Sequence, residues 1–157
     1  MKIKLIYVGK TGKSFLQEGE KEYIKRLKRY ISFDKIEVPD VKNTKKRSEN
    51  EIKTLEAKAI LKHLKPNDFV ILLDEKGKEM SSVEFSTYLQ KQFNLGNRGL
   101  VFVIGGPYGF SESLRQRGDA KMSLSKLTFS HQMIRMFFVE QLYRALTIMK
   151  GEPYHHQ

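Results

Sequence analysis

The sequence has no cysteine among its 157 residues, which excludes disulfides, thiolate metal sites and cysteine nucleophiles. It also has no apolar run approaching the roughly 20 residues that a membrane-spanning helix requires. The opening residues 1–8 resemble a strand rather than a signal peptide, and no small-residue cleavage site follows them. These absences predict a cytoplasmic protein that does not bind a membrane.

Several catalytic and metal-binding motifs are missing as well. The chain has no Walker A motif, no G-x-G-x-x-G dinucleotide fingerprint and no G-x-S-x-G nucleophile elbow. Neither an H-E-x-x-H motif nor a carboxylate cluster is present. His155 and His156 are adjacent, so in an extended tail their side chains point to opposite sides and chelate poorly. We therefore expect no metal ion.

Negative charge is scarce relative to positive charge, and the resulting formal net charge of +11 is unevenly distributed. Residues 1–65 contain 18 Lys and Arg against 9 Asp and Glu, whereas residues 66–157 contain 11 against 9. Phosphate contacts by lysine and arginine release counterions and make binding salt-sensitive. The excess predicts a polyanion-binding surface in the first half, although a lysine-rich surface that only keeps the protein soluble would have the same composition.

Hydrophobic periodicity predicts strands that alternate with helices. Short, nearly continuous apolar runs such as Phe69–Leu73 are typical of strands buried on both faces of a parallel sheet. The predicted strands are 3–8, 33–38, 69–73, 100–104 and 121–124. The predicted helices are 14–31, 48–64, 81–93, 111–117 and 130–149, and turns are predicted at 76–78 and 97–99. The pattern predicts an α/β fold with a mostly parallel sheet flanked by helices, with residues 1–157 forming a single domain.

Local sequence signals mark the starts of two helices. Ser48 with Glu51, and Ser81 with Glu84, each form a capping box. On the first of these helices, the residues predicted to face the core are Ile52, Leu55, Ala59 and Ile60. The last helix is apolar on more than one face, which predicts either a central position in a monomer or a second subunit as its partner.

Two loops that follow strands carry the residues best suited to binding a small molecule. Gly105–Gly109 follows the strand 100–104, and glycines at the carboxyl end of a strand let main-chain groups approach a ligand. Ser123–His131 is rich in Ser and Thr, and His131 could be either a neighbour of the helix cap or a ligand contact. In a basic chain, two such loops predict a cofactor that serves a nucleic-acid substrate, although glycines at strand ends often form simple turns.

Five segments of the chain, in this order, resemble the RlmH family of small knotted SPOUT methyltransferases, which modify large-subunit ribosomal RNA. The segments are Leu72–Lys78, Val103–Gly109, Ser123–His131, Glu140–Ala145 and Pro153–His155. Each alone is weakly specific, but five at family-like spacing are highly specific, and the resemblance spans the whole chain. It implies a trefoil-knotted domain, an exception to the rule that chains do not thread loops, and a homodimer that binds S-adenosylmethionine in the knot.

The resemblance also implies which residues form the site. The implied cofactor contacts are Leu73, Gly106, Ser125, Lys126, Leu127, Thr128, Phe129 and Ser130. The implied reaction is methylation of N3 of a pseudouridine in helix 69 of 23S ribosomal RNA, on the assembled ribosome. The candidate catalytic residues are His131, Arg144, Tyr154 and His155, and the tail of one subunit is expected to reach the cofactor site of its partner.

The roles implied for these catalytic candidates follow from their chemistry. Tyr154 could stack on or orient the base, and His155 could accept the N3 proton directly or through water. Arg144 could steady a negative ring oxygen or a phosphate. The family often has Arg or Lys where this chain has His156, so no fixed cation is expected at that position.

Two other interpretations remain open from the sequence. The chain could be a non-catalytic RNA-binding or ribosome-assembly protein that keeps the knot, or a nucleotide-binding α/β enzyme unrelated to RNA. Binding of S-adenosylmethionine would separate the methyltransferase from the non-catalytic protein. A steep salt dependence of ribosome binding would separate both from the third interpretation. The presence of both loops favours the methyltransferase.

Overall fold

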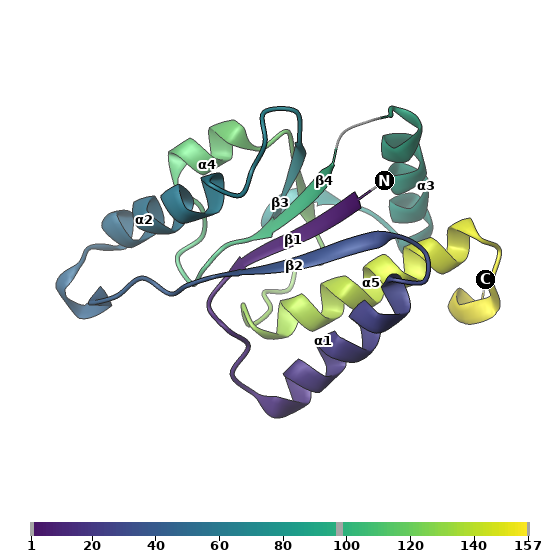
Figure 1. Cartoon of the computed structure of the whole chain (residues 1–157), viewed down its shortest axis with the longest axis horizontal. Helices are drawn as coiled ribbons and strands as arrows, with labels where there is room; N and C mark the ends of the chain where they lie inside the picture. Colours follow the sequence, from purple (N-terminus) through teal and green to yellow (C-terminus); the bar gives the residue numbers. More distant parts are fainter. Residues whose placement is uncertain (1, 97–98, 157) are drawn as a thin grey trace.

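The core of the fold is a five-stranded sheet in the order β2-β1-β4-β3-β5 (Figure 1). The structure is a computed structural model that describes residues 2–96 and 99–156. Every pair of neighbouring strands is parallel. The strands are β1 (Lys2–Val8), β2 (Ser32–Val38), β3 (Phe69–Glu79), β4 (Leu100–Ile104) and β5 (Ala120–Ser123). This arrangement confirms the predicted α/β class and the parallel sheet.

Helices cover both faces of the sheet. Successive side chains of a strand point to opposite faces, and in the central strands the side chains on both faces are apolar. Leu5 and Tyr7 of β1 belong to the core that packs against α1 (Ser14–Leu27), α3 (Ser82–Asn94) and α5 (Met133–Met149). Ile6 and Val8 belong to the smaller core beneath α2 (Glu49–Leu61) and α4 (Glu112–Arg117). Continuous apolar strands therefore produce three layers, as expected for a parallel sheet.

The predicted helix starts are largely confirmed, but several ends differ. Ser81 and Glu84 form a complete capping box, and the Ser48 hydroxyl accepts a hydrogen bond from the Glu51 N–H. Helix α1 ends at Leu27 rather than at residue 31, because the chain tightens into turns closed by bonds to the third residue back, such as Tyr30 N–H to Leu27 O at 2.9 Å. Helix α2 ends the same way, at Leu61 rather than 64.

The inward face of α2 differs from the prediction by one position. Leu55 is 36% exposed, whereas Glu56 and Ala57 are buried with Ile52 and Ile60. The apolar pattern misplaced the face because it could not anticipate a buried glutamate. Helix α5 also begins later than predicted, at Met133. The Ser130 hydroxyl accepts hydrogen bonds from the N–H groups of Gln132 and Met133, so the chain forms a turn before the helix starts.

Strand β3 is longer than predicted, and the turn expected at 76–78 is wrong. The strand passes through Gly77 and pairs with β5 in two stretches that are separated by a register shift between Leu73 and Lys78. A Cβ on Gly77 would lie 2.6 Å from the Met122 backbone nitrogen, so only glycine allows this close pairing. The turn predicted at 97–99 falls largely on residues 97 and 98, which lie outside the described residues.

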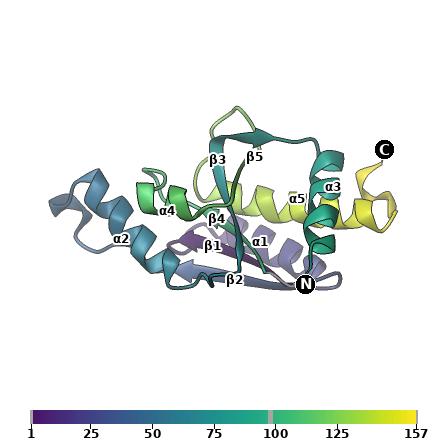
Figure 2. The same cartoon turned by 90° about the horizontal axis from the view of Figure 1, so that it is seen from above.

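Helix α5 connects two opposite ends of the molecule. It begins beside the carboxyl ends of the strands and runs under the sheet to the C-terminal segment, which forms the short 3-10 helix η2 (Pro153–His155). Seen from above, α2 and the short 3-10 helix η1 (Thr44–Lys46) project at one end, and the C-terminal segment lies at the other (Figure 2). Residues on the two halves of α5 are therefore well separated within one chain.

Candidate functional site

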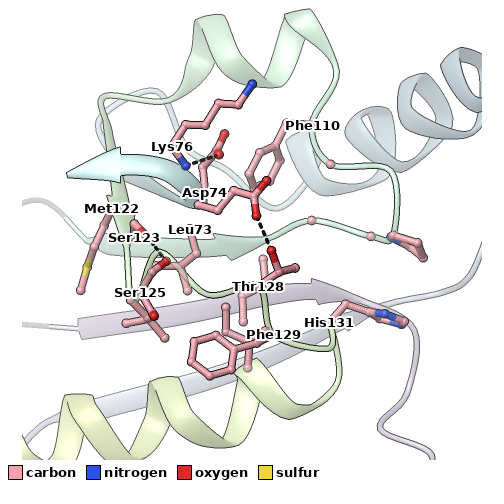
Figure 3. A pocket seen from close by; sticks show the side chains of 18 of the residues that line it. Leu73, Asp74, Lys76, Phe110, Met122, Ser123, Ser125, Thr128, Phe129 and His131 are labelled. Atoms are coloured by element: carbon pink, nitrogen blue, oxygen red, sulfur yellow. Dashed lines mark hydrogen bonds between the residues drawn. The ribbon is translucent and has the colours of Figure 1, made fainter. Parts of the chain in front are cut away.

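A cavity of about 530 Å³ opens where β3, β4 and β5 end (Figure 3). Three segments form its walls, and they are Leu73–Lys76, Ile104–Phe110 and Met122–Ser125 with Leu127–His131. This is the edge of a parallel sheet where small-molecule sites collect, because loops and main-chain groups converge there. The volume falls within the usual range for a ligand pocket.

The first wall exists because β3 bulges between its two stretches of pairing with β5. At the bulge, the Asp74 carboxylate accepts a hydrogen bond from the Lys76 N–H at 2.9 Å and a second from Arg115 at 3.3 Å. The register shift begins after Leu73, whose side chain lines the opening (Figure 3), and bulges of this kind commonly lie next to functional sites. Sequence analysis missed this bulge because it interpreted residues 76–78 as a turn.

The second wall is the glycine loop after β4. Gly106 and Gly109 form an antiparallel bridge, and the Gly109 N–H donates to Gly106 O at 3.1 Å. Gly109 has a φ of +81°, a conformation that residues with a Cβ rarely adopt. The loop therefore folds tightly and presents main-chain groups of Gly105 and Gly106 to the cavity.

The third wall is the Ser/Thr loop after β5, and its own side chains hold it in shape. The Ser123 hydroxyl donates to Ser125 O at 2.8 Å, and the Leu127 N–H donates to the Ser125 hydroxyl at 3.0 Å. Thr128 donates to Glu75 at 2.8 Å, which ties this loop to the bulge of β3 (Figure 3). These bonds fold the loop around the opening and leave the Leu127 side chain 76% exposed.

Most of the cofactor contacts implied by the family resemblance meet at this cavity. The residues that line it are Leu73, Gly106, Ser125, Leu127, Thr128, Phe129 and Ser130. Lys126 is exposed and does not line the cavity. Apolar side chains such as Leu73 beside main-chain groups of two loops can flank an adenine ring and bond its edge. The residues present therefore fit a nucleoside-containing ligand.

His131 also lines the cavity, next to the start of α5. Burial and the nearby Arg135 guanidinium lower the pKa of His131 below its usual 6.5, and the Asp40 carboxylate opposes this shift. A lowered pKa keeps the imidazole neutral near pH 7, so one ring nitrogen is free to accept a proton. Of the four catalytic candidates, His131 is the one that this chain places at its own cavity.

Arg135 is a structural residue that the sequence analysis missed. Its side chain is buried, donating to Val8 O at 2.6 Å, Gly9 O at 3.0 Å and the Thr11 hydroxyl at 3.1 Å. Its guanidinium carbon lies 3.9 Å from the centre of the Tyr7 ring. Arg135 thereby fastens the start of α5, and His131 with it, to the end of β1. An arginine inside an apolar helix was the signal that could have identified it.

The remaining catalytic candidates form a separate cluster at the far end of α5. Arg144 contacts Glu140 at 2.5 Å and donates to His155 Nδ1 at 3.2 Å, and the Tyr154 hydroxyl donates to Glu140 at 2.9 Å. Arg144 can only donate, so Nδ1 must accept, and the neutral His155 ring carries its proton on Nε2. None of these residues lines the cavity of the same chain.

The environment of Tyr154 favours a hydrogen-bond donor over a proton acceptor. Burial and the hydrogen bonds with Tyr23 and Glu140 raise the pKa of Tyr154 far above its usual 10. The Arg144 guanidinium lies 4.8 Å from the centre of its ring. Tyr154 therefore stays a neutral phenol at ordinary pH and can orient or stack on a partner group.

Neither a group of metal-binding side chains nor a membrane-spanning helix is found in the part of the chain that the structure describes. Within residues 2–96 and 99–156, no three His, Cys, Asp or Glu side chains gather in a way that could hold a metal ion. No helix in this described part of the chain is both long and apolar enough to cross a membrane.

Comparison with known proteins gives matches over nearly the whole chain. The family model described as "Predicted SPOUT methyltransferase" matches residues 1–155. A protein of Christiangramia forsetii named "Ribosomal RNA large subunit methyltransferase H" is 55% identical over all 157 residues of both chains, and one of Parabacteroides distasonis with the same name is 54% identical over the same length.

A similar fold occurs among solved structures. The crystal structure of a probable methyltransferase from Bordetella pertussis aligns with a TM-score of 0.57 at 10% identity, covering 92% of this chain and 93% of that one. A probable methylase family protein from Haemophilus influenzae aligns with a TM-score of 0.52 at 12% identity, covering 99% of this chain and 70% of that one. At such low identity these likenesses concern the fold.

Proposed function

The chain belongs to the SPOUT methyltransferase family, and on this premise we propose that it methylates large-subunit ribosomal RNA with S-adenosylmethionine as donor. The observation that carries the proposal is the cavity at the sheet edge, whose glycine and Ser/Thr loops fit a nucleoside-containing ligand. The relatives named Ribosomal RNA large subunit methyltransferase H support the same substrate class. The family also implies the trefoil-knotted topology expected from the sequence.

The cofactor would be held by the residues that line the cavity. Leu73, Gly106 and the loop from Ser125 to Ser130 provide the apolar surfaces and main-chain groups, with Lys126 outside the lining. When bound, S-adenosylmethionine supplies an electrophilic methyl group with a good leaving group already attached. The protein's own task is then to align the acceptor nitrogen and to remove its proton.

We further propose that the target is N3 of a pseudouridine in helix 69 of 23S ribosomal RNA, on the assembled ribosome. His131 suits the role of proton acceptor, because its lowered pKa leaves it neutral and it lies at the cavity. Tyr154, as a neutral phenol, suits orientation of the base. His155 could accept a proton at Nδ1 only after Arg144 releases that atom. Arg144 would then be free to bind a phosphate or a ring oxygen.

The separation of the tail from the cavity supports a homodimer in which each tail completes the partner's site. Figure 1 shows the C-terminal segment at the end of α5 that is far from the carboxyl ends of the strands. Arg144 lies on α5, Tyr154 and His155 lie on η2, and none of the three lines the cavity of its own chain. They can act on the methyl acceptor only if a second subunit brings them to it. On this proposal the whole chain forms one cytoplasmic methyltransferase domain that needs neither metal nor membrane.

Substitution of Tyr154 or His155 by alanine tests this division of labour. Each variant should lose most methylation of ribosomes, measured by mass mapping of 23S ribosomal RNA, yet should bind S-adenosylmethionine with nearly unchanged affinity in calorimetry. The two residues lie outside the cofactor cavity, so their removal should leave its walls intact. Equal loss of methylation and cofactor binding would show that the tail belongs to the cofactor site instead.

The function itself is tested in cells that lack the protein. Ribosomal RNA from such cells should lose one methyl group from 23S RNA, and a plasmid copy of the gene should restore it. If the purified protein binds ribosomes but not S-adenosylmethionine, the non-catalytic interpretation is correct. If ribosome binding shows no steep salt dependence, the RNA substrate itself is wrong.

A further inference from the structure

Glu56 of α2 is a buried carboxyl group that lies directly behind the cofactor cavity. Its side chain is only 6% exposed, and its Oε1 atom is fully buried without a hydrogen-bond partner. It packs against Gly106, where a Cβ would come within 3.0 Å of the Glu56 Cδ. A buried oxygen without a donor is costly and calls for an explanation.

A second carboxylate, that of Asp40, packs against the glycine that follows β1, as Glu56 packs against Gly106 after the neighbouring strand β4. Asp40, which follows β2, lies against Gly9, where a Cβ would come 2.6 Å from Asp40 Oδ1. Gly9 and Gly106 each lie two residues beyond Tyr7 and Ile104, which pair in the sheet. The two carboxyl groups therefore sit behind neighbouring strand ends, and Glu56 forms no ion pair with any lysine or arginine of the described chain.

The charged surroundings of Glu56 favour its neutral form. Burial, and to a smaller degree the Asp40 carboxylate, raise the pKa of Glu56 to about 7. The Asp40 carboxylate also acts on His131 and Arg135: burial lowers the pKa values of both groups, and Asp40 opposes that shift. A change of protonation at Glu56 near neutral pH therefore acts on the carboxyl pair and on the glycine loop in front of it.

We propose that Glu56 is a positioning residue for the cofactor cavity, whose neutral carboxyl group lets the Gly105–Gly109 loop close and whose ionisation loosens that wall. The inference rests on the proposed function, since it concerns the same cavity. Glu56 does not line the cavity, so it acts only through Gly106.

The coupling follows from the cost of burying an unpaired charge. An ionised Glu56 needs water or a donor at Oε1, and the closed packing offers neither. Water can enter only if Glu56 or Gly106 moves, and movement of Gly106 displaces the cavity wall. Cofactor binding and protonation of Glu56 should therefore favour each other, and linkage limits the effect to about tenfold per pH unit above the pKa.

The test is calorimetric titration of S-adenosylmethionine into the purified full-length protein and its Glu56→Gln variant. Measurements at about pH 6.5 and about pH 8.5 lie on either side of the Glu56 transition. We expect the affinity of the unaltered protein to fall by about three- to tenfold at the higher pH. Because glutamine stays neutral, the variant should lose this dependence and bind well at both pH values.

Glu51→Gln is the matched control, since Glu51 is an exposed residue on the same helix. It should keep the full pH dependence, and any titration of the cofactor itself will affect all three proteins equally. Two outcomes would overturn the role of Glu56 but not the proposed function. One is an identical pH dependence in Glu56→Gln and in the unaltered protein, and the other is loss of binding in Glu56→Gln at both pH values. Absence of binding in every protein would overturn the proposed function and this inference with it.

Discussion

Glu56 also affects stability at the scale of a single residue. Its pKa rises from the usual 4.5 to about 7 on folding, so the folded protein binds more protons than the unfolded chain between these values. The contribution of Glu56 to stability is then fully present below about pH 4.5 and is lost as pH rises through about 7.

We expect Glu56→Gln to gain stability relative to the unaltered protein as the pH increases. Between about pH 4.5 and about pH 7.5 the difference in unfolding free energy should shift by about 2 to 3 kcal/mol in favour of the variant. Urea denaturation at a series of pH values measures it, with Glu51→Gln as control. A difference that stays constant with pH would mean that the Glu56 carboxyl is not buried in solution.

Tyr154 and His155 illustrate how neighbours limit what a residue can do. The sequence suggested base orientation for Tyr154 and proton acceptance for His155, and in the structure Glu140 and Arg144 already occupy the atoms concerned. The Tyr154 hydroxyl donates a hydrogen bond to Glu140, and His155 Nδ1 accepts one from Arg144. Glu140 accepts hydrogen bonds from both Tyr154 and Arg144. The sequence did not reveal that Glu140 belongs to this cluster.

At the scale of secondary-structure elements, α5 determines where the site residues lie. His131 at the cavity lies just before the helix, and Arg135 lies in its first turn. Arg144 lies in its second half, where it contacts His155 of η2. The Arg135 side chain donates hydrogen bonds to the main-chain oxygens of Val8 and Gly9 at the end of β1, and such bonds satisfy buried acceptors. The position of His131 thus depends on a buried bond network rather than on the loop alone.

Arg135→Met should therefore destabilise the protein and also weaken the site. We expect a loss of about 2 to 4 kcal/mol in unfolding free energy, because buried carbonyls of Val8 and Gly9 lose their donors. Chemical denaturation followed by circular dichroism measures this loss. Arg29→Met removes the same charge from an exposed position and should cost less than about 0.5 kcal/mol. Similar losses in the two variants would contradict the structural role of Arg135.

The elements differ in how well their boundaries followed from local sequence. The strand 100–104 and the capping box at Ser81 were predicted correctly, because continuous apolar runs and cap hydrogen bonds are local signals. The extension of β3 through Gly77 was not, because it depends on pairing with β5 more than 40 residues later in the chain. Glu56 and Gly106, which also pack together, are likewise more than 40 residues apart along the chain.

At the scale of the whole molecule, one cluster of exposed positive charge follows the carboxyl end of β2. The segment after β2 carries Lys42, Lys45, Lys46 and Arg47, all exposed, and it projects beyond the sheet on the same side as α2 (Figure 2). None of the four forms an ion pair within the described residues. Exposed cations without acidic partners are free to contact RNA phosphates.

Replacing these four residues by glutamine should weaken ribosome binding and make it less sensitive to salt. If each contacts a phosphate, the slope of log affinity against log salt should decrease by about 3 to 4, as measured by filter binding over a salt series. Cofactor affinity should not change, because the segment is separate from the cavity lining.

The quadruple glutamine variant of Lys21, Lys25, Lys28 and Arg29 is the matched control, since these residues are also exposed and carry the same total charge on and just after α1. It should retain most of the salt dependence. If both variants lose the same amount, RNA binding reflects net charge and not the segment after β2.

The sequence by itself determined the α/β class, the parallel strands and the two loops that follow them, because apolar runs, caps and glycines act over a few residues. The two loops could be recognised as candidates for binding a small molecule, and the family resemblance implied most of the individual residues that line the cavity. Only the tertiary structure decided that Glu56 and Arg135 are buried and that Tyr154 lies far from the cavity of its own chain. These features depend on contacts between residues distant in sequence, and no local pattern encodes which distant partners will meet.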